Sequence, residues 1–437
     1  MRKIIDKFID ISVRLSNQIH LKSLRDAVGL TMTIPILAGF MTLLNSLILS
    51  PTGFLSGFVD VNILTKAQEI GTHISNATLG MWTVVLSIAV AYCLSKNKEY
   101  DEPLIAGLVS FCSYIALVPL SISLTGADGE TVISASNILT STYTGVNGMF
   151  TGIFVGLVST EILLRLSKIE KLHIKMPDSV PPMVSKSFDN MIPFMIVVCM
   201  FGIFSFVLNL LFGKSFNELV VTIIQTPIKG LTTSLPGFLF AMLLFNLLFA
   251  FGIHPSGIVG AVIDPILILA ITENTEAIQT GLEAPNIINN TFKSVYGLMG
   301  GTGCTICLII AILLFSKRAD YKAVAKLGLA PGIFNINEPI IFGLPIVMNP
   351  IMIIPFVFVT QISYILTYAA TVVGLIGKCV VQVPWTTPPI LNAFLSTNGD
   401  WRAAIFQVLL IIIGVLIYLP FIKISEKALK RKEQLEI

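Results

Sequence analysis

The run MIPFMIVVCMFGIFSFVLNLLF, residues 191–212, contains no charged side chain. A helix of about 20 apolar residues is long enough to cross the hydrocarbon core of a bilayer. Comparable runs recur along the chain of 437 residues, which is 54% hydrophobic and 12% charged and has a mean hydropathy of +0.86. A soluble globular chain is about one quarter charged. The sequence therefore predicts an all-α polytopic membrane protein.

The apolar runs predict about ten transmembrane helices. They cover residues 27–49, 74–95, 103–124, 145–165, 190–213, 235–253, 256–272, 295–316, about 345–376 and 402–422. The run 256–272 is short and contains Pro265, which we expect to break it. Residues 330–348 are also too interrupted to form one regular span.

Most lysine and arginine residues gather in five short segments. These are residues 2–25, 96–98, 165–186, 317–326 and 423–432. Cytoplasmic loops of membrane proteins carry an excess of Lys and Arg. All five segments are therefore predicted to be cytoplasmic, with both termini inside. The first 26 residues also predict an interfacial amphipathic helix, because apolar residues from Ile5 to Leu15 share one face.

A polar, proline-rich loop at residues 166–189 divides the chain into two halves. The predicted spans of residues 1–188 contain few charges, which is typical of a scaffold. Nearly all the interrupted apolar segments fall in residues 189–437. Irregular backbone at membrane depth persists only where it is buried in protein or lines a wet cavity. We therefore interpret residues 189–437 as the substrate-binding half.

Neither the cysteines nor the glycine-rich stretch predicts a metal or nucleotide site. Cys304 and Cys307 form a C-x-x-C without a second cysteine or histidine pair nearby, so we interpret all six cysteines as packing residues. The stretch GLMGGTGCT, residues 297–305, lacks the Lys-Ser/Thr of a nucleotide-binding loop and is interpreted as close helix packing. This excludes an ATP-driven transporter formed by this chain alone.

One carboxylate stands out in PGIFNINEPIIFGLP, residues 331–345. Ionisable residues inside a membrane are costly and usually face a cavity. Glu338 lies between Asn335, Asn337 and Pro339, and a carboxylate with two amides on an unwound turn offers the directional hydrogen bonds that a polyol needs. The alternative interpretation is a buried structural ion pair, although no basic residue lies close in sequence.

Two further residues are candidates for the same site. His254 closes an apolar run directly before Pro255. It is either a helix-end histidine satisfied by a carbonyl or lipid headgroup, or a polar ligand to substrate. Trp385, in the loop VPWTTPPI, is either a platform for the apolar face of a sugar or an anchor at the membrane interface. Trp401, beside Arg402, is interpreted as an interface anchor.

Several separate blocks resemble the membrane-embedded IIC component of the phosphoenolpyruvate-dependent sugar phosphotransferase system (PTS), in its lactose/cellobiose/diacetylchitobiose branch. The blocks are IKMPDSVPPMVSKSF (174–188), FGIH (251–254), GGTGCT (300–305), PGIFNINEPIIFGLPIVMNP (331–350), PWTTPPI (384–390) and GDWRAAIFQ (399–407). The resemblance covers nearly the whole chain.

The resemblance implies a fold and a function. It implies an N-terminal half that dimerises, and a C-terminal half that holds a disaccharide between re-entrant hairpins near residues 255–290 and 330–348. The sugar would enter as a free β-linked disaccharide, of the cellobiose or N,N′-diacetylchitobiose type, and leave as its 6-phosphate. The chain would be a permease in the bacterial cytoplasmic membrane, and a sugar phosphotransferase only together with its IIB partner.

The resemblance also implies the partners and the site. The phosphoryl group would come from a phosphocysteine on IIB, supplied through IIA and ultimately phosphoenolpyruvate, with no bound cofactor, metal or nucleic acid. His254 and Glu338 would lie near the 6-hydroxyl, with Glu338 as general base. The predicted substrate-binding residues, some of them from the residue analysis above, are Asn335, Asn337, Trp385, Asn246 and Gly252. Related chains often carry Trp where this one has Phe249 or Phe251, so the disaccharide is left open. The alternatives are a proton-coupled secondary sugar transporter and a membrane receptor without transport.

Overall fold

The computed structural model describes residues 18–51, 53–125, 132–174, 176–177, 179–252, 255, 258–344, 346–347 and 349–435. Its packing divides the chain into two compact units. Unit 1 contains residues 36–74 and 229–437, and unit 2 contains residues 17–35 and 75–228. Residues 1–17, which include most of the predicted interfacial helix, lie outside the described residues.

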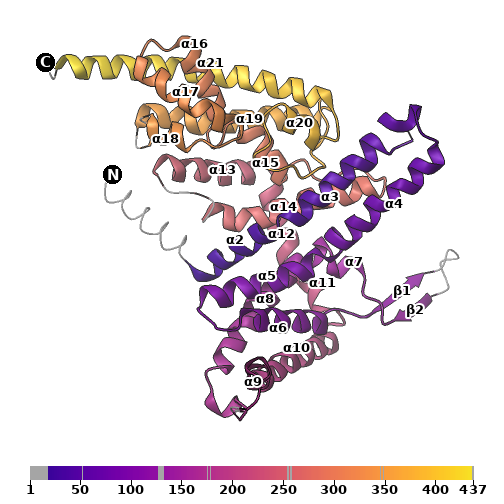
Figure 1. The fold of residues 1–437 in the computed structure, drawn as a ribbon. Coiled ribbons are helices and arrows are strands. Elements are labelled where there is room, and N and C mark those ends of the chain that lie inside the picture. The colour runs from indigo at the N-terminus through magenta and orange to yellow at the C-terminus, as the bar shows by residue number, and fades with distance from the viewer. Residues whose placement is uncertain are drawn as a thin grey trace. The chain divides into compact units, whose positions relative to one another are not determined.

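Unit 2 is built mainly from helices (Figure 1). They are α2 (Ile19–Thr31), η3 (Leu79–Met81), α5 (Trp82–Asn97), α6 (Pro103–Leu117), α7 (Ser141–Thr144), η4 (Val146–Gly148), α8 (Met149–Leu166), η5 (Glu170–Leu172), α9 (Pro182–Asp189), α10 (Met191–Phe212), α11 (Phe216–Val220) and η6 (Val221–Gln225). Helices α4 (Val61–Thr78) and α12 (Thr226–Thr233) contribute residues to both units.

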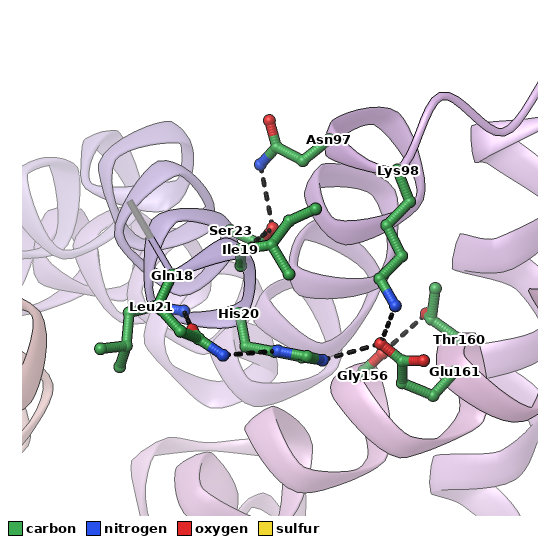
Figure 2. A network of polar contacts seen from close by, with 10 residues as sticks. All are labelled: Gln18, Ile19, His20, Leu21, Ser23, Asn97, Lys98, Gly156, Thr160 and Glu161. Carbon is green, nitrogen blue, oxygen red and sulfur yellow. Dashed lines mark hydrogen bonds and ion pairs between the residues drawn. The ribbon is translucent and has the colours of Figure 1, made fainter. Parts of the chain in front are cut away.

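Small residues bring the helices of unit 2 close together. A Cβ atom added at Gly156 of α8 would lie 2.8 Å from the Val90 side chain of α5. Polar contacts join the same helices near one end, as Figure 2 shows: His20 Nε2 lies 2.7 Å from Glu161 Oε1, and Lys98 pairs with the same carboxylate. These contacts fix the ends of α2, α5 and α8 relative to one another.

A β-hairpin interrupts the helical pattern of unit 2. Strand β1 (Ser121–Thr125) pairs antiparallel with β2 (Val132–Ser136), with Ser121 opposite Ser136. The prediction of one helical run over 103–124 is wrong at its end, because α6 stops at Leu117 and Val118 is already extended before Pro119. The alternation of polar and apolar residues in SISLT favours a strand.

Unit 1 contains the remaining helices. They are α3 (Thr33–Leu43), η1 (Leu44–Ile48), η2 (Phe54–Gly57), α13 (Leu235–Ala250), α14 (Val259–Gln279), α15 (Asn290–Gly297), α16 (Thr305–Phe315), α17 (Ala319–Ile333), α18 (Glu338–Gly343), α19 (Pro350–Val372), α20 (Leu391–Ser396) and α21 (Trp401–Leu435). Helix α21 packs against both α16 and α19 (Figure 1). Aromatic rings of Phe238, Phe292 and Tyr364 meet in the core, with centroids 4.8–5.8 Å apart.

The described part of the chain contains six helices that are long and apolar enough to cross a membrane, or seven if one bent pair is a single span. The all-α polytopic class is therefore confirmed, whereas the count of ten is not. The shorter apolar helices α6 and α16 account for two of the other predicted spans. The predicted break at Pro265 is wrong, because this proline lies inside the continuous helix α14.

The packing units do not follow the sequence division at residue 188. Residues 36–74 pack with the second half of the chain: Gln279 Nε2 donates a hydrogen bond to Thr42 Oγ1 at 2.8 Å, and Ser46 Oγ donates to Asn398 Oδ1. Residues 189–228 belong to unit 2. The assignment of scaffold and substrate roles to residues 1–188 and 189–437 stays a prediction.

Candidate functional site

Three non-helical segments of unit 1 meet around Asn335. We call them the glycine loop (residues 298–304), the asparagine loop (334–337) and the proline loop (384–390). Each follows or precedes a helix that packs in the core of unit 1, and each belongs to a block that the sequence analysis selected. Their meeting therefore brings distant parts of the sequence into one place.

The Asn335 side chain connects all three loops. Its Oδ1 atom accepts a hydrogen bond from the Gly300 backbone at 2.7 Å. Its Nδ2 atom donates to the backbone oxygen of Trp385 at 2.6 Å and to that of Thr387 at 3.0 Å. Asn335 is buried and has a positive φ of 62°, a conformation that asparagine tolerates better than most residues. Asn335, which was predicted to bind sugar, is therefore also the residue that links the three loops through hydrogen bonds.

The glycine loop is built from left-handed residues. Gly300, Gly301, Gly303 and Cys304 all have positive φ angles, between 51° and 98°. A Cβ atom on Gly301 would lie 2.4 Å from Cγ of Asn337, and Asn337 Nδ2 donates to the Thr302 backbone oxygen at 2.8 Å. The interpretation of GLMGGTGCT as close packing of two helices holds only for Gly297, the last residue of α15, where a Cβ atom would lie 1.9 Å from Tyr364 of α19. It is wrong for Gly300, Gly301 and Gly303, which belong to the loop that receives the two asparagines.

Glu338 begins the short helix α18 directly after the asparagine loop, and Pro339 lies in its first turn. Both residues suit this position, because proline fits the first turn of a helix and a carboxylate is favourable near the amino end of the helix. The Glu338 side chain is exposed, whereas Asn335 and Asn337 are buried. The carboxylate is thus accessible on a backbone that buried amides hold in place.

Trp385 is presented in a similar way. Its backbone oxygen is bound by Asn335, but its side chain is 54% exposed. Asn392 Nδ2 also donates to the Thr387 oxygen, at 3.3 Å, so this carbonyl has two amide donors. The asparagine loop and the proline loop therefore display one exposed carboxylate and one exposed indole from a shared framework.

Asn246 and Gly252 lie on and just after α13. Asn246 is fully buried; its Nδ2 donates to Met242 O at 2.9 Å, and its Oδ1 has no hydrogen-bond partner among the described residues. Gly252 has a φ of 81°, and a Cβ there would lie 3.4 Å from Val347 Cγ1. Gly252 therefore lies close to the segment that follows α18. His254 lies outside the described residues.

A buried ion pair that sequence reasoning missed lies beside α13. Lys293 Nζ of α15 is 2.5 Å from Asp264 Oδ1 of α14 and 5.6 Å from the centroid of the Phe245 ring. Lys293 is 6% exposed. A signal for the pair was present in the sequence, because Lys293 is one of only six basic residues outside the five basic segments. Among the described residues, no group of three His, Cys, Asp or Glu side chains is placed to hold a metal ion.

Side-chain amides also satisfy the extended segment 376–383. Asn274 Nδ2 donates to Cys379 O at 2.8 Å, Asn289 Nδ2 donates to the same oxygen at 3.1 Å, and Thr275 Oγ1 donates to Val380 O at 2.7 Å. Irregular backbone in a membrane protein needs such internal partners. The middle of this segment is therefore anchored to α14 and to the residue before α15.

The comparisons with known proteins agree with this architecture. The family "Phosphotransferase system, EIIC" matches residues 25–360. The chain belongs to this family: it is the membrane-embedded IIC permease component of a sugar phosphotransferase system. As a member, it is a multi-pass membrane protein that acts together with IIB and IIA proteins.

Two relatives match over almost their whole length. The chain is 36% identical to the "PTS system oligo-beta-mannoside-specific EIIC component" of Bacillus subtilis (strain 168), over 99% of this chain and 96% of that one. It is 32% identical to the "PTS system cellobiose-specific EIIC component" of Geobacillus stearothermophilus, with the same two coverages. Among solved structures it is similar to the transporter ChbC, the IIC component from the N,N′-diacetylchitobiose-specific phosphotransferase system. The TM-score is 0.91, at 31% identity and 98% coverage of both chains.

Proposed function

We propose that this chain takes up a β-linked disaccharide of the cellobiose or N,N′-diacetylchitobiose type and holds it while a phosphocysteine of the IIB partner phosphorylates its 6-hydroxyl. The named substrates of the relatives support the sugar class: oligo-β-mannoside, cellobiose and N,N′-diacetylchitobiose. All are saccharides with β linkages. Phenylalanines at 249 and 251, within the block that ends at His254, leave the particular disaccharide open.

The observation that carries the proposal is the framework around Asn335. It joins the loop that ends at Glu338 to the loop that displays Trp385. A sugar needs both an aromatic face for its C–H groups and directional acceptors for its hydroxyls. An exposed indole and an exposed carboxylate on one rigid framework supply these two kinds of contact.

The proposed chemical step is transfer of a phosphoryl group from sulfur to oxygen. The sugar 6-hydroxyl oxygen attacks phosphorus, the bond between sulfur and phosphorus breaks, and the IIB cysteine leaves as a thiolate. The hydroxyl proton passes to the Glu338 carboxylate, which acts as general base. His254 would orient the hydroxyl or the carboxylate. This chain's residues bind and orient the sugar and accept one proton, with no cofactor of their own.

The test uses proteoliposomes with purified IIB, IIA and general phosphocarrier, and labelled cellobiose and diacetylchitobiose. Glu338→Gln keeps hydrogen bonding but cannot accept the proton, so the phosphorylation rate at saturating sugar should fall about 10²–10⁴-fold while sugar Kd changes little. The control is Glu69→Gln, at an exposed position of α4. Wild-type phosphorylation by Glu338→Gln would exclude the base role. Sugar accumulating unmodified under a proton gradient would favour a secondary transporter, and binding without flux would favour a receptor.

The assembly is proposed to be a homodimer with both termini in the cytoplasm. Helix α10 is the least buried of the six long apolar helices among the described residues, since only 17% of its most apolar stretch of 18 residues is buried. We therefore assign the surface of α10 to the contact between the two copies of the chain. Ile203, Phe206 and Leu210 are among its exposed side chains. Light scattering of the purified protein in detergent should give twice the chain mass of 47.5 kDa. A single-chain mass would exclude the homodimer.

A further inference from the structure

The proline loop ends in a strained residue. Ile390 has φ 75° and ψ −54°, dihedral angles near those of the rare, positive-φ form of the γ-turn. A β-branched residue with positive φ is a genuine outlier in protein backbones. Such conformations persist only where the surrounding structure holds them, and they cluster at functional sites. The question is what holds Ile390, and to what end.

Gln407 holds it. Gln407 lies on α21 and is fully buried. The Ile390 backbone N–H donates to Gln407 Oε1, and Gln407 Nε2 donates to Val295 O of α15 at 2.6 Å. Both ends of this amide are therefore used, one on the strained turn and one on the helix that precedes the glycine loop. An unsatisfied amide in this buried place would be costly, so the arrangement is firmly specified.

The other side of the proline loop is fixed independently. Asn335 binds the Trp385 and Thr387 oxygens, and Asn392 binds the Thr387 oxygen again. The loop backbone is thus restrained at Trp385, Thr387 and Ile390, while the Trp385 residue remains 54% exposed. A binding group that is fixed before its ligand arrives loses less freedom on binding.

We propose that Gln407 is a positioning residue for sugar binding: by holding Ile390 in the strained turn, it sets the orientation of the Trp385 ring relative to Glu338. This inference rests on the proposed function, because it assigns Trp385 to the sugar. Gln407, which lies in the GDWRAAIFQ block, would thus raise the affinity for the disaccharide without contacting it. A purely structural Gln407 would instead support folding and leave sugar affinity unchanged.

The experiment uses the full chain with Trp401→Phe, so that Trp385 and the buried Trp82 are the remaining tryptophans. Two variants are compared with this parent. Gln407→Met keeps the length of the side chain and removes both hydrogen bonds. Ile390→Gly keeps Gln407 and the backbone N–H but removes the conformational penalty of the turn. Asn137→Gly is the control, because it makes the same kind of change at another positive φ, 62°, outside unit 1.

Three readouts separate the possibilities: acrylamide quenching of Trp385, the Kd of a disaccharide panel, and phosphorylation at saturating sugar. Gln407→Met should change the quenching constant and raise Kd about tenfold, because the loop loses its pre-organisation. Ile390→Gly keeps the hydrogen bond to Gln407 and adopts the turn without penalty, so it should keep the quenching and the Kd of the parent. Turnover at saturating sugar should stay within about twofold, because Glu338 is untouched. Asn137→Gly should match the parent in all three.

The inference is overturned if folded Gln407→Met binds sugar with the parent's Kd and shows the parent's quenching, or if Ile390→Gly loses as much affinity as Gln407→Met. It is also overturned if Gln407→Met lowers only the yield of folded protein. Failure of the proposed function looks different: the parent itself would bind no disaccharide of the panel. The quenching comparison needs no sugar, so it tests the positioning of Trp385 in either case.

Discussion

Asparagine side chains organise the irregular backbone of unit 1. Asn335 and Asn337 bind the glycine and proline loops, while Asn274 and Asn289 bind the extended segment before the proline loop. An amide has both donors and an acceptor on a short side chain, so one residue can satisfy backbone groups from two segments. Where water is scarce, this is an effective way to keep a non-helical chain ordered.

The contact of Gly301 with Asn337 can be tested against a matched glycine. Gly301→Ala and Gly374→Ala both place a side chain at positive φ, 98° and 73°. Only the first Cβ meets a neighbour, at 2.4 Å, whereas nothing lies within 4 Å of the second. Both should lose about 1–2 kcal/mol to the left-handed conformation. Gly301→Ala should lose more and also weaken sugar binding, measured by thermal unfolding and equilibrium binding. Equal effects in the two variants would contradict the contact.

The Lys293–Asp264 pair predicts a non-additive result. Lys293→Met or Asp264→Asn alone should cost about 3–5 kcal/mol, because each leaves a buried or half-buried charge without its partner. The double variant should be more stable than either single one, as measured by thermal unfolding. Asp320→Asn is the control: it removes the exposed Arg318–Asp320 pair and should change stability by less than about 1 kcal/mol. A double variant less stable than both singles would exclude this account.

Sequence reasoning selected Glu338, Asn335, Asn337 and Trp385, because polar or aromatic residues between prolines in an apolar run are conspicuous. Their meeting around Asn335 is what the structure adds; their contact with sugar stays a prediction. Gln407 was not selected, since one glutamine in a long apolar helix has no local signal for what it touches. Its partners are separated from it by 17 and 112 residues.

At the scale of elements, hydropathy located the long helices well and their irregular ends poorly. The run 190–213 corresponds to α10, Met191–Phe212. The hairpin after α6 was missed because an apolar run that continues past a proline does not reveal a change from helix to strand. Pro265 was given too much weight, since a proline inside a buried helix is tolerated when neighbouring groups satisfy the freed carbonyl.

The crossing of α16 and α21 predicts a rescue. A Cβ atom added at Gly414 would lie 2.5 Å from Cys307 Sγ, so Gly414→Ala should destabilise the protein. Adding Cys307→Ala removes the sulfur and should restore part of the loss; thermal unfolding measures both steps. Gly202→Ala on α10, where no atom lies within 4 Å, should be neutral or up to about 1 kcal/mol stabilising. Absence of any rescue would show that the two helices separate instead.

At the scale of the whole molecule, charge predicts orientation and the fold can be used to test it. Glu99 directly follows the second basic segment and Asn137 follows β2, with α6 between them. Asn137→Cys should react with a membrane-impermeant maleimide in intact cells, and Glu99→Cys only after permeabilisation. Both cysteine variants are made in a chain in which Cys112 and Cys199 are replaced by serine. The four native cysteines that remain in it are all buried. The reverse pattern would place both termini outside.

The division into two packing units could not be predicted from hydropathy. Residues 36–74 pack with residues 229–437 through contacts such as Thr42 with Gln279, which are 237 residues apart. A hydropathy profile reports that each segment is apolar but not which partner it meets. The all-α polytopic class follows from composition, whereas the choice of partners follows from side-chain shape and from single polar contacts.

The anchored segment 376–383 has a consequence for hydrogen exchange. The backbone amides of Gly377, Val380 and Val381 donate to Asp400 and to Ser396, at 2.8–3.1 Å, although this stretch is not helical. Their deuterium uptake should be as slow as that of the flanking helices and should quicken in Asn274→Ala, which removes one of the two amide donors to Cys379 O. A protection map alone would suggest a transmembrane helix through this segment, whereas slow exchange here reports hydrogen bonds to Asp400 and Ser396 rather than helical backbone.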